Sequence, residues 1–264
     1  MPVAMIATDL DGTLIRSDGS VSARTRAALE AARGAGVVVA FVTARPPRSV
    51  ETLADDLNIA GVAVCCNGAL LYDLAGRRLI GQQRFAAGVG HAIVSDLRQG
   101  VPGVAFAIQH ATDFSQEGHF PPYWDAWHDE PVARVPCALS AIGDEVAKII
   151  VHHASHDAES LMAAVAPHVR DRAELSHSGL PIVELAPAGV SKASGLAALC
   201  GTLGIGAEGV VAFGDMPNDL EMLAFAGHSV GVANAHPDVL AAVREITLSN
   251  DEDGVAVVIE RLLA

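Results

Sequence analysis

The first ninety residues alternate between short apolar runs and longer amphipathic stretches. The apolar runs span residues 3–8, 37–42 and 61–66. Runs of this length and composition are typical of strands buried on both faces of a parallel sheet. Between them, Ser22 is placed to cap a helix that ends near Gly34, and Pro46 opens a second helix. This order predicts two consecutive βαβ units with right-handed crossovers.

The pattern changes in the middle of the chain. Between residues 83 and 184 the chain gathers nine of its eleven histidines and both tryptophans, and its strands and helices are harder to phase. Only residues 146–152 and 180–185 read clearly as strands. We therefore expect a region with a different architecture from the flanking segments.

The α/β pattern returns after Pro187. A helix is predicted from Ser191, a strand over 210–213, a helix opening at Pro217 and a strand over 229–232. The sequence thus predicts an α/β protein with a Rossmann-like parallel-sheet core formed by residues 1–82 and 187–264. An inserted α+β domain of residues 83–186, of ordinary domain size, would interrupt that core.

Composition and charge narrow the class of protein. Apolar residues make up 51% of the 264 residues and aromatic residues only 4%, which suits helices packed closely on an aliphatic sheet. The net charge of −14 argues against nucleic acid as a partner, because phosphate backbones need a basic surface. No apolar run is long enough to span a membrane and no signal segment precedes the first strand, so we expect a cytoplasmic protein. The four cysteines lack metal-site spacing and read as small buried hydrophobic residues.

Polar residues follow the predicted core strands at the points where these strands end. Ligands of open parallel sheets gather at this edge. The polar groups are Asp9-Leu10-Asp11-Gly12-Thr13 after the first strand, Thr43-Ala44-Arg45 after the second, Asn67-Gly68 after the third and Gly214-Asp215-Met216-Pro217-Asn218-Asp219 after the strand at 210–213. Ser191-Lys192 opens a helix, where free backbone N–H groups favour anions. Each group alone is a weak signal, since a lone Asp-x-Asp is more often a turn. Their joint occurrence predicts one site.

With these residues in order, the chain resembles the Cof-type phosphatases of the haloacid dehalogenase superfamily, which carry a large α/β (type C2) cap inserted in the core. Asp9 and Asp11 match the first motif of the family, Thr43 the second and Lys192 the third. The fourth motif is matched by Asp215, Asn218 and Asp219. One departure is Ala44, where this branch commonly has glycine; alanine keeps the backbone N–H.

The resemblance implies a Mg²⁺-dependent phosphatase that acts on a small phosphorylated metabolite, such as a sugar phosphate. Asp9 would attack phosphorus and form an aspartyl-phosphate, and Asp11 would act as acid and base. The implied metal ligands are Asp9, the backbone carbonyl of Asp11, and Asp215. Phosphate contacts are implied for Leu10, Thr43, Ala44, Lys192 and Asn218, with Thr13 and Asp219 in support. Asn67 is implied as a contact either to the phosphate or to the cap that closes over it.

Three alternatives use the same or similar residues. A phosphomutase shares the aspartate pair and differs in cap closure. A dehalogenase needs neither an acid for an alkoxide nor a metal, so Asp11 and Asp215 speak against it. A non-catalytic sugar-phosphate sensor would not need the complete set.

Two further patterns imitate binding motifs. Residues 204–209 match GxGxxG, but they follow a helix and precede a strand, the reverse of a dinucleotide fingerprint. Residues 249–260 imitate a calcium loop but begin with Ser249 and run into an apolar helix.

Overall fold

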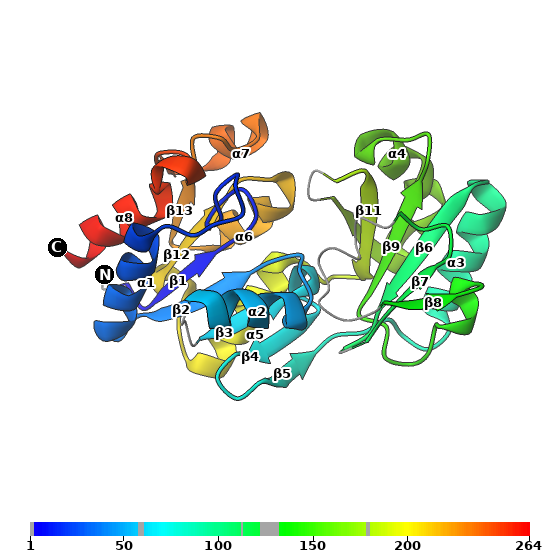
Figure 1. Ribbon diagram of the computed structural model, residues 1–264, viewed down its shortest axis with the longest axis horizontal. Helices are drawn as coiled ribbons and strands as arrows, with labels where there is room; N and C mark the ends of the chain where they lie inside the picture. Colours follow the sequence, from blue (N-terminus) through cyan, green and yellow to red (C-terminus); the bar gives the residue numbers. More distant parts are fainter. Residues whose placement is uncertain (1–2, 58–60, 112, 122–131, 178–179) are drawn as a thin grey trace.

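The computed structural model describes residues 3–57, 61–111, 113–121, 132–177 and 180–264, and these residues form two sheets (Figure 1). The strands of the first, or core, sheet are β1 (Met5–Thr8), β2 (Val38–Val42), β3 (Val62–Cys65), β4 (Leu70–Asp73), β5 (Arg78–Gln82), β12 (Val210–Gly214), β13 (His228–Gly231) and β14 (Glu245–Ile246). Their order is β14-β13-β12-β1-β2-β3-β4-β5. The six strands from β14 to β3 are parallel. The sequence predicts five of them; β14, a strand of two residues at the edge, is not predicted.

The other end of this sheet is an antiparallel hairpin that the sequence analysis did not assign. β4 pairs antiparallel with both β3 and β5. β5 alternates exposed and half-buried residues, as an edge strand with one solvated face does. Its sequence, Arg-Leu-Ile-Gly-Gln, contains too few apolar residues to stand out as a buried strand.

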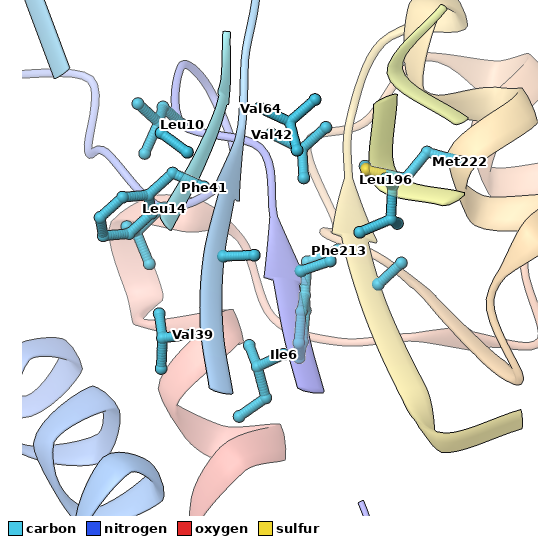
Figure 2. Close-up of a cluster of buried hydrophobic side chains, with 14 of the residues drawn as sticks. Ile6, Leu10, Leu14, Val39, Phe41, Val42, Val64, Leu196, Phe213 and Met222 are labelled. Carbon is cyan, nitrogen blue, oxygen red and sulfur yellow. The ribbon is translucent and has the colours of Figure 1, made fainter. Parts of the chain in front are cut away.

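Helices cover both faces of the core sheet: α1 (Ala23–Gly34), α2 (Pro47–Leu57), α5 (Lys192–Leu203), α6 (Leu220–Phe225), α7 (Pro237–Ala242) and α8 (Gly254–Leu263). Figure 2 shows Phe41 of β2 facing the side of α8, whereas Val42 faces Leu196 of α5 and Met222 of α6. The predicted cap of α1 is present, because Ser22 Oγ accepts a hydrogen bond from Thr25 N at 3.0 Å. Among the described residues, no helix combines the length and the apolar character needed to cross a bilayer.

The second sheet forms the cap. Its strands are β6 (Val104–Gln109), β7 (Phe114–Glu117), β8 (Ala133–Val135), β9 (Lys148–His153), β10 (Ala173–Ser176) and β11 (Ile182–Pro187), in the order β10-β11-β9-β6-β7-β8. Helices α3 (Val89–Gly100) and α4 (Ala158–Val169) pack on one face. The predicted fold class, an α/β core with an α+β cap, is confirmed.

The chain enters the cap after β5 and returns to the core after β11, so the predicted strands at 146–152 and 180–185 are the central pair β9 and β11. Their side chains alternate between the two faces of the cap sheet. Ile149 and Val151 of β9 join the cluster beneath α3 and α4. Ile150 of the same strand joins a smaller cluster on the opposite face with Ile182 of β11. The face opposite α3 and α4 carries polar groups such as Lys148 toward the core.

The two imitations of binding motifs have structural roles. Gly204 ends α5 in the left-handed conformation, with φ of 68°. Asp251 accepts hydrogen bonds from the backbone and hydroxyl of Ser17, and Asp253 is paired with Arg16 at 2.7 Å.

One prediction about the cysteines is wrong: Cys137 is half-buried and lies beside Arg98, whereas Cys65, Cys66 and Cys200 are buried.

Candidate active site

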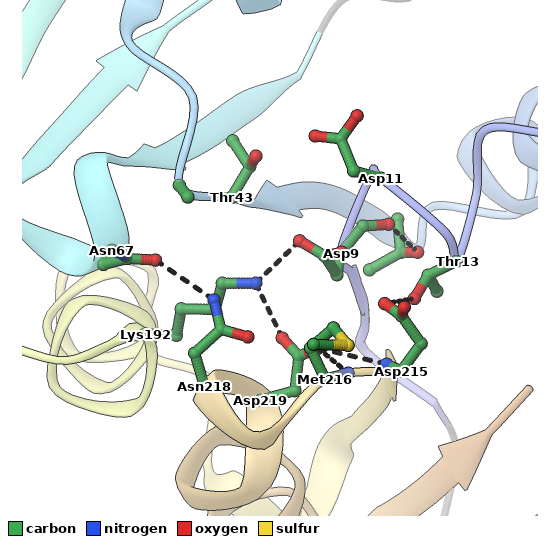
Figure 3. A network of polar contacts seen from close by, with 12 residues as sticks. Asp9, Asp11, Thr13, Thr43, Asn67, Lys192, Asp215, Met216, Asn218 and Asp219 are labelled. Carbon is green, nitrogen blue, oxygen red and sulfur yellow. Dashed lines mark hydrogen bonds and ion pairs between the residues drawn. The ribbon is translucent and has the colours of Figure 1, made fainter. Parts of the chain in front are cut away.

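The carboxyl ends of four neighbouring core strands meet at one edge of the sheet. β12, β1, β2 and β3 are adjacent, so the residues that follow them converge although they are far apart in sequence. Figure 3 shows the side chains of Asp9, Thr43, Asn67 and Asp215 gathered at this edge. Asp9 is held in place by its backbone N–H, which donates to Phe213 O of β12 at 3.0 Å.

Lys192 joins this group from the first turn of α5. Its Nζ donates to Asp9 Oδ1 and to Asp219 Oδ1, each at 2.7 Å (Figure 3). Ser191 caps the helix, and its backbone lies so close to Gly68 that a Cβ there would be 2.0 Å from Ser191 O. Gly68 also has φ of +104°, a conformation that other residues rarely adopt. This glycine therefore lets α5 approach the loop after β3 and brings the lysine to Asp9.

The loop after β1, residues 9–13, holds the Asp215 carboxylate in place. Thr13 Oγ1 donates to Asp215 Oδ1 at 2.8 Å. Gly12 has φ of +78°, and a Cβ at this position would lie 2.5 Å from Asp215 Oδ2. The glycine thus leaves the space that the Asp215 carboxylate occupies.

Asp219 binds donors with both carboxylate oxygens. Oδ1 accepts from Lys192, and Oδ2 accepts from the backbone N–H groups of Asp215 and Met216 at 3.0 and 3.1 Å. The side chain is fully buried, at 0% exposure. These contacts hold the loop after β12 in shape and orient the lysine ammonium.

Burial and like charge dominate the electrostatics of the site. Desolvation raises the pKa of Asp9 well above its ordinary value, even though Lys192 acts in the opposite direction. Desolvation and the neighbouring Asp219 raise the pKa of Asp215 to about 6. For Lys192, burial would lower the pKa, but the carboxylates of Asp219 and Asp9 outweigh it and hold the pKa above its ordinary value. The site therefore concentrates negative charge that favours a cation.

Asp9, Asp215 and Asp219 can each place one carboxylate oxygen within 4.8 Å of the others, and all three are buried. Carboxylate oxygens are the ligands that Mg²⁺ prefers. Because both oxygens of Asp219 already accept hydrogen bonds, Asp9 and Asp215 have the greater freedom to bind a metal. The donor set fits a divalent cation.

Asp11 lies differently from the other acidic residues. Its carboxylate is 41% exposed and forms a two-pronged ion pair with Arg45, with contacts of 2.8 Å from Nε and 2.6 Å from Nη2. In Figure 3 its carboxylate points away from Lys192. The sequence analysis quoted Arg45 in the second motif but gave it no role, so its pairing with Asp11 is new information.

The remaining predicted residues divide between the phosphate side and the cap side. Thr43 and Ala44 line the same cavity as Asp9, and so does Asn218. Leu10 is fully buried in the core, so only its backbone can serve a ligand (Figure 2). Asn67 is buried and donates to two cap residues, Ser176 Oγ at 3.2 Å and Glu184 Oε2 at 3.0 Å. It therefore lies between core and cap.

The cavity between core and cap has a volume of about 230 Å³. Its lining includes the predicted Asp9, Asp11, Thr43, Ala44, Lys192 and Asn218, together with Arg45, Met216, Leu180 and Glu184. Leu180 and Glu184 come from the cap, for which the sequence analysis named no site residue. A signal was available for one of them, because a charged residue inside an apolar strand such as 182–187 is rarely buried without a purpose.

Comparison with known proteins agrees with this geometry. The family model described as haloacid dehalogenase-like hydrolase matches residues 6–259. A Bacillus subtilis protein, 5-amino-6-(5-phospho-D-ribitylamino)uracil phosphatase YwtE, is 29% identical, with 98% of each chain covered. The HMP-PP phosphatase of Cronobacter sakazakii is 28% identical over 89% of this chain and 86% of its own. A haloacid dehalogenase-like hydrolase from Bacteroides thetaiotaomicron has a TM-score of 0.83 at 28% identity, with 98% of this chain and 99% of that chain covered.

The chain belongs to the haloacid dehalogenase-like hydrolase family. The resemblance inferred from the strand-end motifs is confirmed, and with it the prediction of an enzyme of the hydrolase class. The buried aspartate cluster is typical of the metal site of this family.

Proposed function

We propose that this hydrolase is a Mg²⁺-dependent phosphatase that cleaves a small phosphorylated metabolite through an aspartyl-phosphate intermediate. The contact of Lys192 with both Asp9 and Asp219 carries the proposal, because it places a fixed cation beside a buried carboxylate. Such a carboxylate is suited to attack phosphorus. The phosphatase names of two relatives over most of their length support the reaction class.

The proposed roles follow the geometry. Asp9 attacks phosphorus, and the bond from phosphorus to the leaving oxygen breaks as the bond to the Asp9 carboxylate forms. Thr43 and the backbone N–H of Ala44 bind the phosphoryl oxygens, and Lys192 balances the charge that those oxygens share with Asp9. When bound by Asp9, Asp215 and the backbone carbonyl of Asp11, Mg²⁺ supplies the positive charge that lets two anions approach.

Asp11 delivers a proton to the leaving oxygen and then takes one from the water that attacks the aspartyl-phosphate. In the structure both oxygens of this carboxylate are bound by Arg45. We propose that Asp11 turns away from Arg45 when the substrate enters, which frees Arg45 to contact the phosphate or the leaving group.

We further propose that residues 83–186 form the domain that selects the substrate, with Leu180 at the leaving group. A cavity of about 230 Å³ suits a small metabolite rather than a polymer. The cap closes over it and excludes water.

The proposal is tested by measuring release of inorganic phosphate from p-nitrophenyl phosphate and from a panel of phosphorylated metabolites. We expect release that requires Mg²⁺ and stops in excess EDTA. Transfer of phosphate between two positions of a substrate, without its release, would instead indicate a phosphomutase. No reaction with any ester in the presence of Mg²⁺ would contradict both.

Asp11→Asn should slow the enzyme according to the leaving group. An alkyl phosphate such as glycerol phosphate needs protonation of its leaving oxygen, so we expect a loss of about 10²–10³-fold in kcat/KM. For p-nitrophenyl phosphate, whose leaving group departs unprotonated, we expect a loss of about tenfold or less. Equal losses for both esters would contradict the acid role. Asp18→Asn, an exposed carboxylate of the following loop, is the control.

Mg²⁺ binding should weaken in acid. The pKa of Asp215 is raised from 3.8 to about 6. In the metal-free protein the protonated Asp215 carboxyl is therefore the form that favours the folded state. This stabilisation is lost as the pH rises from 3.8 through about 6. Protons then compete with the metal as the pH falls below 6, so we expect tighter Mg²⁺ binding at about pH 7.5 than at about pH 5. Calorimetric titration at the two pH values measures this, and equal affinities would contradict it.

A further inference from the structure

A buried ion pair lies on the face of the cap sheet opposite α3 and α4. Lys148 of β9 and Glu184 of β11 are in contact, and their side chains are only 2% and 1% exposed. Glu184 stands opposite Ile150 in the register of the two strands, so Lys148 is its diagonal neighbour on the same face. For Lys148, burial would lower the pKa, but the Glu184 carboxylate outweighs it and holds the pKa above its ordinary value. Lys148 therefore keeps its positive charge beside this carboxylate.

The pair touches the core at two strand ends. Lys148 Nζ donates to Ala44 O, in the loop after β2, at 2.8 Å. Glu184 Oε2 accepts from Asn67 Nδ2, in the loop after β3, at 3.0 Å. Asn67 also accepts at Oδ1 from Asn218 of the loop after β12, at 3.4 Å. One cap ion pair thus links directly or through Asn67 to three loops that carry proposed phosphate-binding residues.

The contact with Ala44 bears on the hydroxyl of Thr43. Ala44 O and Arg45 N belong to the same peptide unit, so the cation at the oxygen fixes the direction of the N–H. That N–H donates to Thr43 Oγ1 at 3.1 Å. Because the hydroxyl oxygen accepts this bond, its own proton remains available for a ligand oxygen in the cavity that Thr43 lines. Lys148 therefore orients the Thr43 hydroxyl indirectly, through the rigid peptide unit between Ala44 and Arg45.

Stability alone does not account for such a pair. Replacing a buried ion pair with apolar residues of similar volume is often neutral or stabilising, because both charges lose their hydration. The cap contains another ion pair, Arg98 with Glu117, in which the Glu117 side chain is fully buried and the Arg98 side chain is 31% exposed. It hydrogen-bonds to the cap residues Phe106, Ala138 and Cys137. That pair offers a comparison inside the same domain, because its carboxylate is as buried as that of Glu184.

We propose that Lys148 and Glu184 are positioning residues that couple cap closure to phosphate binding. When the cap lies on the core, Lys148 orients the Ala44–Arg45 peptide and Glu184 holds Asn67. The loops after β2 and β3 are therefore fully arranged for phosphate binding only in the closed state. The proposal rests on the proposed phosphatase function. It gives the cap a role in binding the phosphoryl group itself, in addition to any contact with the leaving group.

The test compares Lys148→Met, the double variant Lys148→Met/Glu184→Gln and the control Arg98→Met. The measured quantities are the melting temperature, the affinity for inorganic phosphate by calorimetry with Mg²⁺ present, and KM and kcat for p-nitrophenyl phosphate. Lys148→Met should weaken phosphate binding and raise KM by about tenfold or more, the value of one charge-assisted hydrogen bond. We expect kcat to fall by a smaller factor, because Asp9 and Lys192 are untouched.

The double variant separates positioning from simple attachment of the cap. Lys148→Met alone leaves the Glu184 carboxylate buried without its cation, so we expect a lower melting temperature. The double variant also removes the negative charge of Glu184 and should restore the melting temperature. Phosphate affinity should stay weak in the double variant. Recovery of affinity together with melting temperature would overturn the proposal, as would an equal loss of affinity in Arg98→Met.

The activity of the wild-type protein distinguishes a failure of the phosphatase proposal from a failure of the coupling proposal. If the wild type hydrolyses no ester, the phosphatase function fails, while the calorimetric comparison still tests the coupling. If the wild type hydrolyses p-nitrophenyl phosphate and Lys148→Met binds phosphate as tightly as the wild type, only the coupling fails.

Discussion

Asp9→Asn should reduce phosphate release by about 10⁴-fold or more, because an amide cannot act as the nucleophile in place of the carboxylate. The fold should be retained. Asparagine has the same shape, and its Oδ1 can still accept the hydrogen bond from Lys192 that Asp9 Oδ1 accepts now. Because burial raises the pKa of Asp9, replacing it with a neutral group should leave the metal-free protein as stable as the wild type or more so.

Two measurements check this result. Steady-state hydrolysis of p-nitrophenyl phosphate with Mg²⁺ gives the loss of rate, and thermal unfolding without metal gives the stability. In the wild type, acid quenching during turnover followed by mass spectrometry should find one phosphoryl group on the peptide that contains Asp9. Asp55→Asn, which removes an exposed carboxylate paired with Arg77, is the control and should retain full activity. Activity of Asp9→Asn above about 1% of wild type would show that another group is the nucleophile.

Lys192→Met should remove activity and destabilise the fold together. The change leaves the Asp9 and Asp219 carboxylates buried without the ammonium that now lies 2.7 Å from each. Breaking a buried pair in this way costs about 3–5 kcal/mol of unfolding free energy near neutral pH. The loss of transition-state charge balance should lower kcat by about 10²–10³-fold.

The stability loss should depend on pH and on charge. Uncompensated buried carboxylates have raised pKa values, so they cost most when ionised and least when protonated, and the deficit should shrink as the pH falls. Lys192→Met/Asp219→Asn removes one of the two carboxylates and should regain part of the stability but none of the activity. A Lys192→Met protein with wild-type melting temperature at neutral pH would contradict the electrostatic account of the site.

The parallel strands, and the polar residues that follow them, were predictable from the sequence. Short apolar runs identify β1, β2, β3 and β12, and the carboxyl-end rule for parallel sheets brings Asp9, Thr43 and Asp215 to one edge. The predicted start of a helix at Ser191 places Lys192 in the first turn of that helix. The residues therefore meet as the strand and helix ends require, and their catalytic roles remain proposals.

The cap side of the site was not predictable in the same way. Leu180 and Glu184 reach the cavity because an antiparallel sheet folds over the core, and antiparallel register depends on pairings that a single sequence does not state. The Arg45–Asp11 pair depends on rotamers in two loops. In Lys148 and Glu184 the sequence did contain a signal, since each is a charged residue within an apolar strand.

The position of β12 beside β1 has a consequence for synthesis of the chain. β1 lies between β2, which follows it closely, and β12, which is made only after the cap residues. Lys192 and Asp9 are 183 positions apart, and Thr13 and Asp215 are 202 apart. Contacts between such distant positions form late, because closing long loops costs entropy before the contacts repay it. A nascent chain can therefore complete its cap on the ribosome before the phosphate site forms, because Lys192 and Asp215 are synthesised after the cap residues.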